Sequence, residues 1–167
     1  MRSASFQIVL ATALLGLTAG AAPVPPEAEK PLFSEEDAKT LSAYRLDVPK
    51  LDRFETVLRE MDLKSQADEA LKEELNQDEA KAAGIDRFVE AIEKEKPKMM
   101  AILQAAGEPT REFVLTSYSV MMAMVYADLL KAESDAAMPS YVPRENLGFV
   151  KRHEDRLTKL FEALNHE

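Results

Sequence analysis

Residues 112–130 read EFVLTSYSVMMAMVYADLL, and a helical projection of this stretch places apolar side chains on nearly every side. The apolar side chains form two neighbouring stripes, one with Val114, Tyr118, Met121, Val125 and Leu129, the other with Leu115, Met122, Tyr126 and Leu130. A helix that is apolar almost all round is usually buried at the centre of a protein. Because the other helical segments carry narrower apolar stripes, we expect amphipathic helices to pack around this one.

The same stretch is also a candidate membrane span. Its uncharged run at 113–127 is shorter than the roughly 20 residues that cross a bilayer, contains Thr116, Ser117 and Ser119, and is followed by Asp128. We therefore favour a buried core helix, and we expect no integral membrane span in the mature chain. Asp128 is expected to point to solvent, because burying an unpaired carboxylate is costly.

The whole pattern predicts an all-α fold. We expect an irregular bundle of about five or six helices around a buried central helix, at about residues 110–133, that packs against a C-terminal helix. No run alternates apolar and polar residues with β-branched enrichment, and the chain has only 5 glycines. The motifs LDRF at 51–54 and IDRF at 85–88 are interpreted as coincidence, because the other positions of a helical-hairpin repeat are absent.

Local signals predict where the helices begin and end. Ser34 and Asp47 are expected to be N-caps, Pro97 to end or kink a helix, and Gly107 to be a C-cap. A last, continuous helix is expected to begin between residues 143 and 146 and to pack along the central helix. Residues 138–143 are expected to form an extended crossing, because their two prolines disfavour helix in the residues just before them.

The expected apolar faces repeat every three or four residues. Their members are Leu51, Phe54, Leu58 and Met61; Ile85, Phe88, Val89 and Ile92; Met99, Ile102 and Leu103; and, in the last helix, Leu147, Val150, Leu157, Leu160, Phe161 and Leu164. Residues 62–83 carry a weaker stripe, so we expect a solvated helix with a break near 76–78 and low local stability. The central helix is expected to end near Ser134.

The first residues have the pattern of a secretory signal peptide. Residues 1–21 combine a positive start, an apolar core at 8–17 and the small residues AGA at 19–21, so we expect cleavage after Ala21. An uncleaved N-terminal anchor is the alternative. Residues 22–33 are rich in proline and are expected to form a disordered linker, which leaves residues 34–167 as a single helical domain.

Composition limits the compartment and the partners. The chain has 167 residues, a formal net charge of −9 and no cysteine, and removing Arg2 with the signal peptide makes the mature chain still more acidic. An acidic chain is not expected to bind nucleic acid or an anionic membrane surface by default. The absence of cysteine excludes disulfides and a lipid-modified cysteine. We therefore expect a bacterial protein that is exported, either periplasmic or secreted.

Methionine is the first candidate for metal chemistry. The chain contains eight methionines, and those at 99, 100, 121, 122, 124 and 138 would be soft ligands for Cu(I) in an exported protein. A soft-metal site needs several sulfur atoms on one exposed spot, whereas Met121 and Met124 form the only pair of suitable spacing within the apolar run. Methionine as flexible core filler is the simpler interpretation.

His153 is the only histidine inside the predicted fold, where it lies among the apolar positions of the last helix. It is a candidate ligand for a metal or a haem iron, although a satisfied core or boundary histidine is commoner. No second histidine has the spacing of a zinc-protease helix, and no Glu-x-x-His motif of a di-iron bundle occurs. Thr116, Ser117 and Ser119 lack the strand-to-helix turn of a nucleophilic hydrolase.

The C-terminal half carries several short motifs together: AG at 106–107, REF at 111–113 with LT at 115–116, and Asn146 with FV at 149–150 and His153. With these motifs the chain resembles a loosely defined group of small exported bacterial proteins of unknown function. It departs from that group at 108–110, where EPT replaces a Thr-Pro cap. The resemblance implies no activity, cofactor or catalytic residue.

We expect a non-enzymatic protein that binds a partner protein or a hydrophobic small molecule in the bacterial envelope. The expected ligand-binding residues are Tyr118, Met122, Tyr126 and His153, with no catalytic residue, no metal site and no cofactor. The alternative hypothesis is a metal- or haem-binding helical bundle that uses His153 and the core methionines. An enzyme with an unrecognised site is a third hypothesis, because fold and function are only loosely linked.

Overall fold

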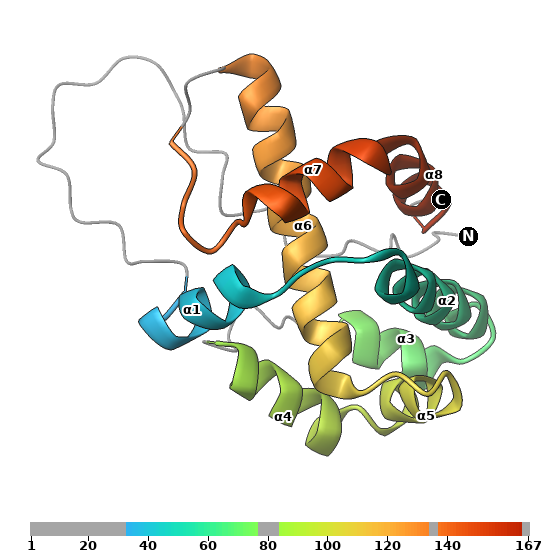
Figure 1. Ribbon diagram of the computed structural model, residues 1–167. Helices are drawn as coiled ribbons and strands as arrows, with labels where there is room; N and C mark the ends of the chain where they lie inside the picture. Colours follow the sequence, from blue (N-terminus) through green and yellow to red (C-terminus); the bar gives the residue numbers. More distant parts are fainter. Residues whose placement is uncertain (1–32, 77–83, 134–136, 165–167) are drawn as a thin grey trace, which may run out of the picture.

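The computed structural model describes residues 33–76, 84–133 and 137–164 (Figure 1). The expected signal peptide and nearly all of the proline-rich linker lie outside the described residues. So do residues 77–83, where part of the weak helical stripe was expected, and the expected end of the central helix near Ser134.

The described residues form α-helices and contain no strand, which confirms the all-α prediction. Their eight helices are α1 (Glu35–Ala43), α2 (Val48–Ser65), α3 (Glu69–Asn76), α4 (Ile85–Glu95), α5 (Pro97–Ala105), α6 (Thr110–Ala132), α7 (Arg144–Arg152) and α8 (Glu154–Leu164). The number exceeds the expected one because two segments that were predicted to be continuous helices are broken.

The predicted caps are present. Ser34 Oγ accepts a hydrogen bond from the backbone N–H of Asp37 at 3.1 Å, and Asp47 Oδ1 accepts one from Lys50 at 2.9 Å. Gly107 follows α5 with φ +65°, a conformation that favours glycine at the end of a helix. These local signals therefore determine where α1 and α2 begin and where α5 ends.

The first unexpected break separates α2 from α3. Asp68 Oδ1 accepts hydrogen bonds from the backbone N–H groups of Ala70 and Leu71, at 3.1 and 3.2 Å, and so caps α3. The break at 66–68 therefore precedes the expected one near 76–78, most of which lies outside the described residues. An aspartate cap replaces the continuous solvated helix that the composition of this stretch favoured.

The long helix α6 runs through the middle of the molecule and contacts α1, α2, α4 and α7 (Figure 1). Its buried residues are Thr110, Phe113, Val114, Leu115, Thr116, Ser119, Val120, Met122, Ala123 and Ala127. Among the described residues α6 is the one helix long and apolar enough to cross a membrane, with a mean hydropathy of 1.5 over the tested window, of which 44% is buried inside the protein. Core helices of soluble proteins meet the same criterion. Asp128 is exposed, as expected, and Lys131 Nζ lies 3.0 Å from its Oδ1.

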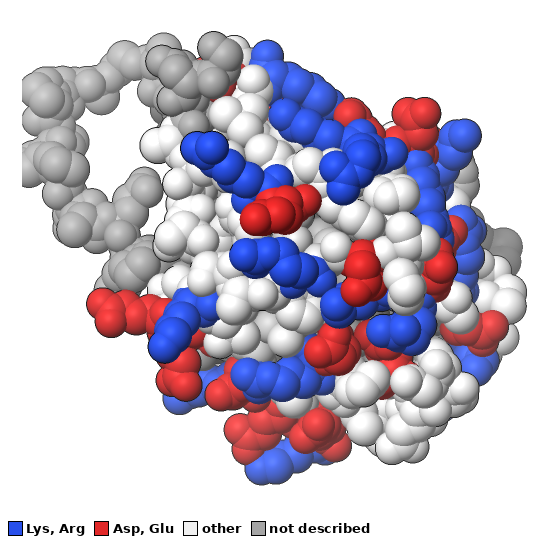
Figure 2. Space-filling view, viewed as in Figure 1, with Lys and Arg blue, Asp and Glu red and all other residues white. Residues whose placement is uncertain are grey.

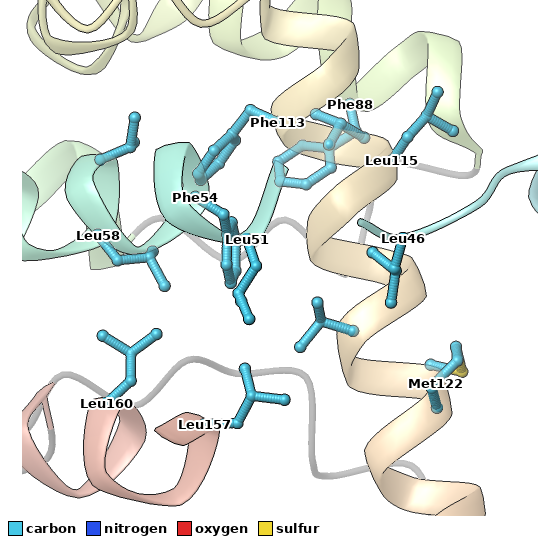
Figure 3. Close-up of a cluster of buried hydrophobic side chains, with 14 of the residues drawn as sticks. Leu46, Leu51, Phe54, Leu58, Phe88, Phe113, Leu115, Met122, Leu157 and Leu160 are labelled. Carbon is cyan, nitrogen blue, oxygen red and sulfur yellow. The ribbon is translucent and has the colours of Figure 1, made fainter. Parts of the chain in front are cut away.

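The second unexpected break is at His153, between α7 and α8. A single last helix packed along the central helix was expected, and this prediction is wrong for the second half of that helix. The first half, α7, packs on α6, whereas the second half, α8, packs on α2. Figure 3 shows Leu157 and Leu160 of α8 facing Leu51 and Leu58 of α2. Leu157 and Leu160 are both 0% exposed, so the change of direction buries two leucines that a straight helix would not bring to α2.

Carboxylates from distant helices cap α4 and α5. Asp37 Oδ1 accepts the backbone N–H of Ile85 at 3.2 Å, and Glu74 Oε2 accepts those of Lys98 and Met99, each at 3.0 Å. Gly84 precedes α4 with φ +109°, and a Cβ there would lie 2.9 Å from Asp37 Oδ2. The cap of α4 therefore requires glycine at this position.

Candidate functional site

Three of the four predicted ligand-binding residues lie together on α6. Tyr118, Met122 and Tyr126 follow one another at a spacing of four residues, which places them on one side of a helix. Met122 is buried, with 8% of its surface exposed, and belongs to the hydrophobic core. The Tyr118 ring makes edge contacts with Phe33 and Phe88, at centroid distances of 5.4 and 5.9 Å.

The chain's own aromatic rings cover this side of α6. Phe33 also contacts Tyr141, with ring centroids 5.0 Å apart, and Tyr141 shares a side-chain hydrogen bond with Tyr126. Burial, together with that hydrogen bond, raises the pKa of Tyr141 to about 12. Burial also raises the pKa of Tyr118, with a smaller contribution from the charge of Asp37. Because Tyr118 and Tyr126 contact the rings of Phe33 and Tyr141, a packing role for these tyrosines is favoured. Ligand binding by them stays a prediction.

The fourth predicted residue, His153, lies on a different element. It is the residue between α7 and α8, it is half-buried, and its ring contacts that of Phe149 with centroids 4.4 Å apart and the ring planes tilted by 43°. The structure therefore places His153 where the chain changes direction. Its function as a ligand stays a prediction.

The methionines are distributed between the core and its margin. Met61, Met99 and Met122 are buried, whereas Met100 and Met124 are partly buried, and the Thr110 hydroxyl donates to Met100 Sδ at 3.2 Å. Within the described part of the chain, no group of three or more His, Asp and Glu side chains is placed to hold a metal ion. Methionine sulfur is not among these side chains, so binding of Cu(I) by the methionines stays a hypothesis.

A largely buried polar cluster that no sequence pattern indicated lies at the N-terminal half of α6. Tyr44 Oη donates a hydrogen bond to Glu112 Oε2 at 2.9 Å and lies 2.8 Å from Thr116 Oγ1, which donates to it because the single tyrosine proton is already used. Thr116 is 0% exposed. Burial raises the pKa of Tyr44 well above its usual range. The hydrogen bond from Thr116 opposes this increase, whereas the hydrogen bond to Glu112 and its charge add to it.

Asn146 joins this cluster to α7. Its Oδ1 accepts the backbone N–H of Leu46 at 2.9 Å, and its Nδ2 donates to the carbonyl of Tyr44 at 3.0 Å. Asn146 is 1% exposed. The Asn146 amide thus forms hydrogen bonds with backbone groups of Tyr44 and Leu46, on either side of Arg45. These bonds hold the connection between α1 and α2 against α7.

Glu108 and Arg53 form the solvent-facing end of the cluster. Arg53 Nε donates to Glu108 Oε2 at 2.7 Å, and this hydrogen bond raises the pKa of Arg53. The Glu108 side chain is 0% exposed, and its Oε1 has no hydrogen-bond partner among the described residues. Because the Thr116 hydroxyl is inaccessible to solvent, the cluster is better suited to stabilising the contact between helices than to catalysis. Its residues Glu112, Thr116 and Asn146 also belong to the C-terminal motifs that carry the resemblance.

A second feature that the sequence analysis missed is an open depression of about 470 Å³ among α2, α3 and α5. Its lining residues are Leu63, Lys64, Ala67, Asp68, Leu71, Lys98, Ala101 and Ile102. Leu71 and Ile102 are buried, at 2% and 4% exposed, whereas Leu63 is 63% exposed. Its apolar base beside an exposed leucine, with a few charged groups, makes this open depression a candidate binding site.

The walls of the depression are fixed by charged side chains. Lys98 on α5 forms an ion pair with Asp68, and this hydrogen bond lowers the pKa of Asp68. Asp68 also caps α3, and Glu74 of α3 caps α5. The hydrogen bonds and the ion pair between α3 and α5 therefore fix the relative positions of these two helices, so the depression is preformed. Leu63 lies off the buried face of α2, and this is the one sequence signal that points to the site.

Comparison of the chain with protein-family models, with curated proteins and with solved structures finds no match. The functional proposal therefore rests on the geometry of the described residues.

Proposed function

We propose that this chain is an exported, non-enzymatic helical protein of the bacterial envelope that binds a partner protein or a hydrophobic small molecule. The binding site in this proposal is the depression among α2, α3 and α5. The proposal includes an irregular bundle around α6 as the scaffold, no integral membrane span in the mature chain, and no nucleic-acid partner. The export part rests on the signal-peptide pattern at 1–21.

The observation that carries the proposal is the exposure of Leu63. At 63% it is the most exposed of the large hydrophobic side chains that the structure describes as exposed, and it lies beside the depression rather than on an isolated spot. Single exposed apolar residues need no explanation, but an exposed leucine that borders a concave apolar site does. An acyl chain or the apolar face of an amphipathic helix is the kind of ligand that fits such a site.

The absence of an enzymatic role in the proposal is supported by the state of the polar cluster. Tyr44 forms hydrogen bonds with both Glu112 and Thr116, and Thr116 is 0% exposed. Groups of this kind stabilise a connection between helices.

Site-specific photo-crosslinking in the native cell tests the proposed site. A photoreactive amino acid replaces Leu63 in one strain and Val48 in a control strain; Val48 is on the same helix, is 45% exposed and does not line the depression. We expect a discrete crosslinked lipid or protein from position 63 and much less of it from position 48. No product from position 63, or equal products from both positions, would show that the ligand does not bind in the depression.

The export part has a separate test. The intact mass of protein purified from the periplasm or the medium should correspond to a chain that begins at Ala22. The full-length mass, or recovery only from the cytoplasm, would contradict export with cleavage after Ala21.

A further inference from the structure

The exposed face of α7 carries basic residues at helical spacing. Arg144, Lys151 and Arg152 are exposed. Arg144 and Lys151 are seven residues apart and lie one above the other, whereas Arg152 lies about 100° further round the helix, in line with the exposed Glu145. The opposite side carries the buried residues Asn146, Leu147, Phe149 and Val150. This surface, Arg144, Lys151 and Arg152 together with Gly148 between them, is called the α7 basic face below.

Gly148 brings one of the guanidinium groups onto this face. A Cβ at Gly148 would lie 3.4 Å from Arg152 Nη1, so the Arg152 side chain lies along the helix beside the glycine. The guanidinium group of Arg152 therefore lies close to the backbone of α7 at Gly148.

The charges of the α7 basic face are not neutralised within the described part of the chain. None of the ion pairs among the described residues involves Arg144, Lys151 or Arg152. The acidic neighbours have other partners: Glu145 lies 3.8 Å from Arg45, and Glu154 pairs with Lys131. Asp155 follows in the first turn of α8 without such a pair.

The basic face is unusual for this protein, because the chain as a whole has a formal net charge of −9. Figure 2 shows several blue Lys and Arg side chains over the region where α7 crosses α6 in Figure 1, with red Asp and Glu side chains between them, and more red side chains at the lower edge, in the region of α4. Exposed charges farther apart than about 8 Å are largely screened at physiological salt, so a nearby ligand responds to the local patch.

We propose that the α7 basic face is an interaction surface for a short acidic segment of a partner protein. Arginine forms two parallel hydrogen bonds with a carboxylate, and two of the three cations are arginines. This surface is distinct from the depression among α2, α3 and α5, and it goes beyond the proposed function.

An acidic peptide segment fits this surface better than an anionic membrane does. Membrane-surface helices combine cations with large exposed apolar side chains, whereas the exposed large hydrophobic residues of the described chain are Val48, Leu63 and Val125, none of them on α7 or α8. A membrane would also face the acidic remainder of the molecule, while a short peptide contacts only the basic face.

Fluorescence anisotropy with a labelled poly-glutamate peptide tests the surface. The full chain is compared with Arg144→Glu/Arg152→Glu and with the control Lys39→Glu/Arg87→Glu, which makes the same charge change at exposed positions of α1 and α4. Unfolding midpoints of all three proteins are measured first. The neutral pair Arg144→Gln/Arg152→Gln replaces the reversal if the reversal lowers the midpoint.

We expect the unchanged protein to bind the peptide, the α7 variant to bind it about tenfold more weakly, and the control to stay within about twofold. Equal losses in both variants would mean that only total charge matters, and would overturn the proposal. Absence of peptide binding, or binding to phosphatidylglycerol vesicles without binding to the peptide, would overturn it too. Because Leu63 is unchanged in every variant, these outcomes are independent of the crosslinking test at the depression.

Discussion

Asn146 on α7 donates a hydrogen bond from Nδ2 to the backbone carbonyl of Tyr44 at 3.0 Å, across 102 residues of sequence. The other end of the same Tyr44 residue, its ring hydroxyl, bonds Glu112 and Thr116 on α6. One connection between α1 and α2 is thus fastened to two helices from the second half of the chain. Packing alone would not fix the direction of this connection, whereas buried hydrogen bonds do.

Removing the Asn146 amide should therefore destabilise the fold. Asn146→Ala leaves the Tyr44 carbonyl and the Leu46 N–H without their partner in a buried site, and we expect a loss of about 2–3 kcal/mol in the free energy of unfolding. Urea denaturation measures it. Glu145→Ala, at the exposed neighbouring position, is the control and should change stability by less than about 0.5 kcal/mol. Equal effects of the two variants would contradict a fastening role for Asn146.

The hydroxyl pair of Tyr44 and Thr116 should behave as a coupled unit. We expect Tyr44→Phe and Thr116→Val each to cost about 1–2 kcal/mol, because each leaves a buried polar partner behind. In the double variant the costs should fall short of their sum by about 0.5–1 kcal/mol. Strict additivity in a double-mutant cycle by chemical denaturation would show that the hydrogen bond between them contributes nothing.

The cap that Glu74 provides for α5 should be worth more than an ordinary surface carboxylate. Glu74→Ala removes the acceptor of the Lys98 and Met99 N–H groups, and we expect a loss of about 1–2 kcal/mol. Glu73→Ala on the same helix is the control, since Glu73 is exposed. The difference in thermal midpoint between the two variants measures the cap, and no difference would refute it.

Lys96 should make stability depend on pH above neutrality. Burial lowers the pKa of Lys96 from 10.5 to about 8, opposed in part by the charge of Glu74. Between these values the unfolded chain binds more protons than the folded one, so the free energy of unfolding should rise as pH increases from about 8 towards 10.5. Lys96→Met should lack this rise. Parallel stability curves for the two proteins over that interval would contradict the lowered pKa.

Much of the fold could be predicted because its signals are local. Ser34 and Asp47 cap helices within three residues of themselves, and the apolar residues of α2 recur at the spacing of one helical face. Leu51 and Met61, at the two ends of that face, are 0% and 1% exposed. The apolar composition of α6 likewise predicted a helix that contributes many residues to the core, although only 44% of its most apolar window is buried.

The predictions from the sequence were wrong where contacts between distant segments override the local preference for a continuous helix. Neither glycine nor proline is present at His153, so nothing in that helix predicts its end, and the burial of Leu157 and Leu160 against α2 decides it. Asp68 did provide a local signal, an N-cap before α3, but the high helix propensity of its neighbours concealed it.

The candidate sites were the least predictable part. Tyr44 and Thr116 are 72 residues apart in sequence, and no periodicity relates them. The depression requires the relative positions of α2, α3 and α5, which no single helix specifies. Tyr118, Met122 and Tyr126 could be grouped on α6 from their spacing, but the rings of Phe33 and Tyr141 that cover them come from elsewhere in the chain.

Native mass spectrometry of the mature protein purified from its own envelope tests most directly whether the chain binds an apolar ligand through the depression. We expect the unchanged protein and Val48→Glu to retain a lipid or a protein partner that a denatured control releases, and Leu63→Glu to have lost it. A bare monomer from the unchanged protein, or the same bound species on Leu63→Glu, would contradict binding at this site.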